Sequence, residues 1–62
     1  MKSLGAMIKQ LSGLIDTTDL NDWENLFVTS VVEQTRDGDI TGTLSDKQVI
    51  IVERIFNKHF AG

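Results

Sequence analysis

The stretch from Leu44 to Phe60, LSDKQVIIVERIFNKHF, carries the strongest local signal for the fold. Ser45 followed three residues later by Gln48 is the pattern of a capping box, in which the two residues bond reciprocally at a helix N-terminus. Leu44, just before the cap, can pack on Val49 as a hydrophobic staple. The pattern therefore predicts a helix that begins at Ser45 and continues to the end of this stretch.

The predicted helix has one broad apolar face at about 100° per residue. Its members are Val49, Val52, Phe56 and Phe60, flanked by Ile51 and Ile55. Lys47, Arg54 and Lys58 fall together on the opposite side. These three are the candidate nucleic-acid-binding residues, because cations in a row can follow a phosphate backbone. Lys2 or Lys9 would extend the row if the first helix packs beside it. The alternative is an ordinary solvated helix face.

The segment 37–44 precedes this helix and is expected to be the main loop, because it holds two glycines and shows no helical period. If a short fourth helix exists, it lies within 38–43, where Gly38 and Gly42 disfavour it. Earlier in the chain, apolar residues at helical spacing predict two further helices, at about 20–36 and about 3–15.

These elements predict an all-α fold, a small three-helix bundle in a single domain over residues 1–62. Trp23 is expected to be a core anchor rather than a base-stacking residue, because it continues an apolar stripe. His59 suits the last helical turn as a structural residue, and Ile50 falls off the core arc as a candidate partner contact. The predicted core is Leu4, Met7, Ile8, Leu11, Leu14, Leu20, Trp23, Phe27, Val31, Leu44, Val49, Val52, Ile55, Phe56 and Phe60.

The 37–48 segment also has to be compared with a calcium-binding EF-hand loop. Loop positions 1, 3, 5, 6, 8, 9 and 12 are Asp37, Asp39, Thr41, Gly42, Leu44, Ser45 and Gln48. The motif requires a bidentate Glu at position 12, and neutral Gln48 cannot supply it. The capping box accounts for Ser45 and Gln48 without a metal. A degenerate single EF-hand-like calcium loop is kept as a further alternative, and no metal ligand is assigned.

The composition excludes several classes of protein. The chain has no cysteine, no proline and one histidine, which rules out a disulfide framework, a thiolate zinc site and thiol catalysis. It shows no P-loop and no arrangement typical of acid–base or nucleophilic catalysis, so neither enzymatic activity nor a cofactor is predicted. The longest apolar run, Val49–Val52, is far too short for a membrane span. We therefore expect a soluble protein of the cell interior that makes no membrane contact.

Three segments together resemble a known family: DTTDLNDWEN at 16–25, LSDKQ at 44–48 and ERIFNKHF at 53–60. The chain resembles the UvsW.1-like family of T-even-like phages, the small companion proteins of the UvsW recombination helicase. The resemblance covers nearly the whole chain and lies in helix caps and core positions. It implies a small helical bundle that assists phage DNA recombination and repair in the cytoplasm of the bacterial host cell. The partners that it implies are a phage helicase and branched or single-stranded DNA.

Two hypotheses for function follow from the residues and the resemblance. The first is a non-enzymatic, helicase-associated accessory module that binds nucleic acid weakly through Lys47, Arg54 and Lys58. The second is a protein–protein interaction module without DNA contact, which the net charge of −3 and the isoelectric point near 4.7 favour. The oligomeric state stays open, and the surface around Ile50 is a candidate dimer contact.

Overall fold

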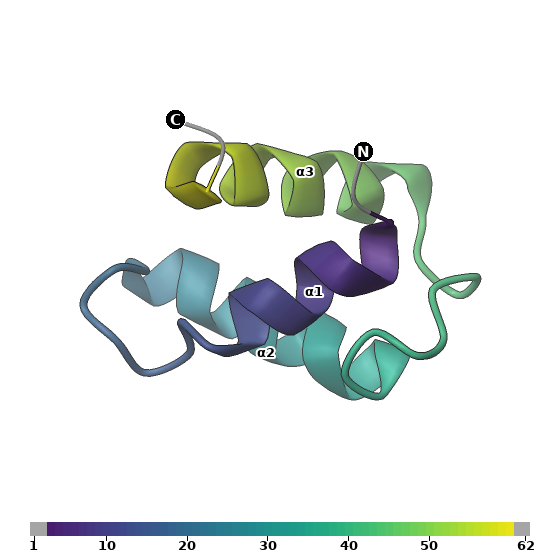
Figure 1. Ribbon diagram of the computed structural model, residues 1–62, viewed down its shortest axis with the longest axis horizontal. Helices are drawn as coiled ribbons and strands as arrows, with labels where there is room; N and C mark the ends of the chain where they lie inside the picture. Colours follow the sequence, from purple (N-terminus) through teal and green to yellow (C-terminus); the bar gives the residue numbers. More distant parts are fainter. Residues whose placement is uncertain (1–2, 61–62) are drawn as a thin grey trace.

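The computed structural model describes residues 3–60 and contains three α-helices. Helix α1 spans Leu4–Ser12, α2 spans Asp22–Thr35 and α3 spans Asp46–Phe60 (Figure 1). No strand occurs within the described residues. The predicted small all-α bundle of three helices is therefore confirmed.

The first helix holds the bundle together. Helices α2 and α3 run in opposite directions, and α1 crosses α2 (Figure 1). The α1 backbone packs closely against both other helices, whereas the backbones of α2 and α3 make far fewer close approaches to each other. Within residues 3–60, no helix combines the length and the apolar character needed to cross a membrane.

Helix α1 is shorter than the predicted 3–15. Ser3 caps its N-terminus by accepting a hydrogen bond from the Ala6 N–H, and the helix ends at Gly13. Beyond it, Leu14 and Ile15 continue in turns and still pack against the core. The periodicity of apolar residues therefore extended past the helix, because a turn can place the same side chains on the core.

Helix α2 begins two residues later than predicted, at a capping box that the sequence analysis missed. The Asn21 side chain accepts a hydrogen bond from the Glu24 N–H at 2.7 Å, and the Glu24 carboxylate accepts one from the Asn21 N–H at 3.1 Å. The helix ends in a left-handed residue, Arg36, with φ 51°. The residue pattern Asn-x-x-Glu at the start of an apolar run is the signal that could have located this N-terminus.

The short fourth helix considered for 38–43 does not form. Arg36, Asp37 and Gly38 have φ values of 51°, 61° and 91° in succession, so the backbone turns away from α2. The N–H of Ile40 then donates back to the carbonyl oxygen of Thr35 at 2.8 Å. The segment is a loop made of turns, because consecutive left-handed residues cannot continue a right-handed helix.

Helix α3 begins as predicted. The Ser45 N–H donates to Gln48 Oε1 at 2.9 Å, and the Gln48 N–H donates to Ser45 Oγ at 3.2 Å, which confirms the capping box. Leu44 packs against the core, and Val49 is half-buried. Of the two members of the predicted staple, Leu44 thus packs on the core, whereas Val49 is only partly buried.

Most of the predicted core is confirmed, with two corrections. The buried apolar residues are Ile8, Leu11, Leu20, Val28, Val31, Val52, Ile55 and Phe56. Leu4, Met7, Leu14, Phe27 and Leu44 pack around them at partial exposure. The prediction was wrong for Trp23, which is 58% exposed, and for Phe60, which is 43% exposed. It also left out Val28, and it included Val49, which is only half-buried.

Trp23 was misassigned because α2 is rotated about its own axis relative to the predicted orientation. The buried positions of this helix are Glu24, Val28, Val31 and Thr35. They recur at helical spacing, one residue out of phase with the stripe that begins at Trp23. This rotation places Trp23 on the outside. Apolar periodicity missed it because two residues on the core side of α2, Glu24 and Thr35, are polar.

Phe60, the last residue of α3, lies against Phe56 with ring centroids 5.1 Å apart.

Helix α1 and the loop after α2 approach each other backbone to backbone. A Cβ built on Gly5 would lie 2.5 Å from the carbonyl oxygen of Gly38, and a Cβ built on Gly38 would lie 2.5 Å from the carbonyl oxygen of Gly5. The contact has no room for any side chain, so glycine is required on both sides.

We expect Gly5→Ala to lower the free energy of unfolding by about 1–3 kcal/mol, because overpacking outweighs the gain of about 1 kcal/mol in helix propensity. Gly42→Ala is the matched control, since a Cβ there meets nothing within 4 Å. Urea unfolding followed by circular dichroism measures both. A Gly5→Ala protein as stable as the wild type would show that α1 does not dock this closely.

Candidate binding site between α2 and α3

The three cations of the predicted basic face are all exposed on α3. Arg54 and Lys58 line one hollow, whereas Lys47 lies nearer the start of the helix and outside it. Lys58 also pairs with Glu24 of α2, with Nζ 3.1 Å from Oε2. Lys9 is exposed on α1 and does not line this hollow, and Lys2 lies outside the described residues. The structure thus brings Arg54 and Lys58 together and adds Lys47 along the same helix.

The hollow lies between the N-terminal part of α2 and the C-terminal half of α3. Its volume is about 420 Å³. The α2 side contributes Asn21, Trp23 and Glu24, and the α3 side contributes Ile51, Arg54, Ile55 and Lys58. A space of this size takes one or two side chains of a partner, and its lining combines apolar carbon with two cations.

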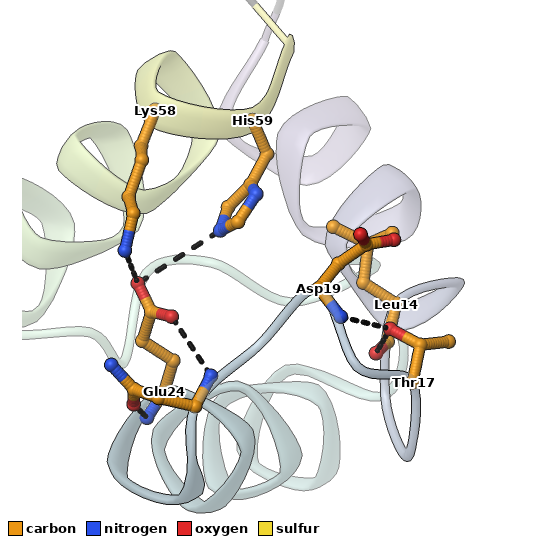
Figure 2. Close-up of polar contacts among 7 residues, drawn as sticks. Leu14, Thr17, Asp19, Glu24, Lys58 and His59 are labelled. Carbon is orange, nitrogen blue, oxygen red and sulfur yellow. Dashed lines mark hydrogen bonds and ion pairs between the residues drawn. The ribbon is translucent and has the colours of Figure 1, made fainter.

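Glu24 is the buried polar residue that joins the two helices at this hollow (Figure 2). Glu24 is only 6% exposed. One carboxylate oxygen accepts the capping hydrogen bond from the Asn21 N–H, and the other accepts a hydrogen bond from Lys58 Nζ. The backbone hydrogen bond from Asn21 lowers the pKa of Glu24, burial opposes this shift, and Lys58 and His59 lower the pKa further. The carboxylate is therefore held in its charged form.

His59 stands beside this carboxylate at the distance of an ion pair but makes no hydrogen bond to it. Its Nε2 atom lies 3.9 Å from Glu24 Oε2, and its side chain is 15% exposed (Figure 2). Within residues 3–60 the Nε2 atom is buried and has no hydrogen-bond partner. His59 thus lies in the last turn of α3, as the helix bounds predict, and its structural role stays a prediction.

A second hollow lies on α2 itself and was not expected. Its lining is Trp23, Leu26, Phe27 and Ser30. The Trp23 and Phe27 rings stack with centroids 5.5 Å apart and an interplanar angle of 8°. Leu26 is 69% exposed, more than any other large apolar residue among the described ones. The signal was present in the sequence as an apolar stripe, but we assigned that stripe to the core.

The loop compared with an EF-hand gives no support to a calcium site. The Gln48 side chain accepts a hydrogen bond from the Ser45 N–H and donates one from Nε2 to Gln34 Oε1 at 3.1 Å. Its oxygen is thus already used at the helix cap. Within residues 3–60, no three side chains of His, Cys, Asp or Glu are grouped so that they could hold a metal ion. The capping box explains this part of the sequence.

Comparisons with protein-family models, with curated proteins and with solved structures gave no match for this chain.

The lowered pKa of Glu24 makes stability depend on pH in a definite direction. The charged carboxylate is stabilised in the folded state, so its contribution is present above the ordinary pKa near 4.5 and is lost as the pH falls through the lower folded value. We expect the free energy of unfolding to fall more steeply in acid for the wild type than for Glu24→Gln. Chemical unfolding at several pH values between about 3 and 6 measures this difference.

The matched variants separate the two roles of Glu24. Glutamine can still accept the Asn21 hydrogen bond, so Glu24→Gln should cost about 1–2 kcal/mol for the lost ion pair, given that Lys58 is half exposed. Glu24→Ala should cost about 1 kcal/mol more, because it also removes the side-chain acceptor for the Asn21 N–H. Equal acid slopes for the wild type and Glu24→Gln would contradict the assignment.

Proposed function

We propose that this chain is a non-enzymatic accessory module of phage DNA recombination and repair, which works beside a helicase in the bacterial cytoplasm and contacts nucleic acid weakly. The observation that carries the proposal is the exposure of Lys47, Arg54 and Lys58 along one helix. The resemblance to the UvsW.1-like family supports the setting, namely a phage helicase and branched or single-stranded DNA.

The strength of this contact follows from the charges. Lys47 and Arg54 form no ion pair within residues 3–60, whereas Lys58 already faces Glu24. The first two therefore contribute most to phosphate binding. Up to three phosphate contacts give a slope of log K against log salt of about −2 to −3. The net charge of −3 opposes approach to DNA, so binding should be weak and lost at moderate salt.

The test is an amide-resolved NMR titration with a forked DNA duplex, at low and then at moderate salt. We expect shifts at Lys47, Arg54 and Lys58 that weaken with salt. The double variant Lys47→Ala/Arg54→Ala should lose about tenfold in affinity or more. Its slope of log K against log salt should become shallower, changing from about −2 to −3 to about −1. Both side chains are exposed, so the variant should keep its fold.

Lys9→Ala is the matched control, because it removes an exposed cation from α1 that does not line either hollow. Its affinity for DNA should stay within about twofold of the wild type, because it loses at most one weak contact. An equal loss in Lys9→Ala and in the double variant would show a general charge effect and refute the α3 face. No shift at any salt concentration would refute nucleic-acid contact.

A second candidate function, a protein–protein interaction module without DNA contact, is favoured by the exposed apolar side chains of Trp23 and Leu26, which line one hollow. Large exposed apolar groups that lie together mark interaction surfaces more often than they serve a monomer. Retention of the purified helicase on the immobilised chain at high salt would support this function, provided that the DNA titration gives no shifts.

A further inference from the structure

Two neighbouring side chains of α3 face the same oxygen of one buried carboxylate. Lys58 Nζ lies 3.1 Å from Glu24 Oε2 and donates a hydrogen bond to it. His59 Nε2 lies 3.9 Å from that same oxygen and makes no hydrogen bond (Figure 2). The other oxygen of Glu24 accepts the capping hydrogen bond from the Asn21 N–H. Lys58 and His59 therefore share a single acceptor atom.

The two side chains differ in how much they need this acceptor. The Lys58 side chain is 58% exposed, whereas the His59 side chain is 15% exposed and its Nε2 atom is buried within residues 3–60. An ammonium that leaves Glu24 returns to water at little cost, because exposed ion pairs contribute little stability. A proton on the buried Nε2 requires an acceptor, since a buried charge without a partner is costly. Once His59 is protonated, it therefore has the stronger demand for Oε2.

The surroundings leave Glu24 as the partner of a protonated His59. Within residues 3–60, it is the only carboxylate at ion-pair distance from the imidazole. The other charged residues of α1, of the segment before α2 and of the first turn of α2 are exposed and form no ion pair: Lys9, Asp16, Asp19 and Asp22. Histidine side chains change charge between about pH 5 and 8. Glu24 stays charged over this range, because the Asn21 hydrogen bond and the nearby cations lower its pKa.

We propose that protonation of His59 transfers Glu24 from Lys58 to His59 and releases Lys58 to act with Arg54 in the hollow. His59 Nε2 has to approach Oε2 by about 1 Å to reach the length of a charge-assisted hydrogen bond. Arg54 and Lys58 line the same hollow and then form a pair of cations without a carboxylate partner. Such a pair can hold a phosphate group. The consequence for nucleic acid rests on the proposed function, whereas the exchange of partners at Glu24 does not.

The exchange is tested in the free protein by NMR between about pH 5 and 8. The ring nitrogens of His59 report its protonation, and carbon relaxation at Cε reports the mobility of each lysine side chain. We expect Lys58 to become more mobile as His59 gains its proton. Lys47 is the internal control, because it is exposed and has no ion pair within residues 3–60, and its mobility should not change. A His59 that stays neutral at pH 5, or a Lys58 that stays ordered, would overturn the proposal.

Two variants isolate the groups of the exchange. His59→Gln cannot gain a charge, so Lys58 should stay ordered at every pH in this range. Glu24→Gln removes the shared carboxylate, so Lys58 should be mobile at every pH. Glu33→Gln is the matched control, because it removes an exposed carboxylate of α2 that forms no ion pair within residues 3–60. Its pH response should match the wild type, and loss of the response in Glu33→Gln would refute the assignment to Glu24.

The consequence for nucleic acid is measured with the forked DNA duplex at pH 7.5 and 5.5, conditions chosen to be about one unit on either side of the ordinary value for histidine. Affinity at low salt should rise about fivefold toward pH 5.5, and the slope of log K against log salt should steepen by about 0.9, which corresponds to one added phosphate contact. His59→Gln and Lys58→Ala should each bind equally at both pH values.

Lys58→Ala separates the release of Lys58 from a general effect of charge. A rise in affinity that persists in this variant would show that the proton on His59 acts on DNA directly, and would refute the release of Lys58. Absence of DNA binding at both pH values would refute the proposed function, and the mobility of Lys58 in the free protein would still decide the exchange. Thermal unfolding of each variant at both pH values checks that its fold is intact.

Discussion

The orientation of α2 depends on one buried carboxylate. Glu24 closes the capping box of its own helix with one oxygen and meets Lys58 of α3 with the other. Since α2 and α3 have few close backbone approaches, this contact is the polar link at one end of the pair. At the other end, Gln48 donates to Gln34. The two links join the antiparallel helices near their two ends, and the hollow lies near the Glu24 end.

Burial of Glu24 has a consequence for the neighbouring indole. Consecutive helical residues are 100° apart, so a helix that turns Glu24 inward turns Trp23 toward the surface. The charged form of the carboxylate is stabilised by a backbone N–H and by a cation, which offsets the cost of burial. The most amphipathic solution for α2 would bury Trp23 and expose Glu24. The structure adopts the opposite because the polar contacts of Glu24 form only on the inside.

The sequence was sufficient for the fold class and for α3, and insufficient for the rotation of α2. Helix α3 follows from local signals, namely a capping box and a face whose buried residues, Val52, Ile55 and Phe56, are all apolar. Helix α2 mixes buried polar residues, Glu24 and Thr35, with exposed apolar ones, Trp23 and Leu26. Its two faces therefore differ little in hydrophobicity, and periodicity cannot choose between them. The tertiary contact of Glu24 with α3, which joins residues far apart in the chain, favours the observed rotation together with the burial of Val28 and Val31.

The candidate site was predictable in part for the same reason. The cations of α3 share a face by helical spacing alone, so Lys47, Arg54 and Lys58 were found from the sequence. The hollow between the helices was not, because it depends on the distance between α2 and α3. Nor was the ion pair of Lys58, whose partner Glu24 lies 34 residues earlier. Long-range partners of this kind leave no periodic trace in a single sequence.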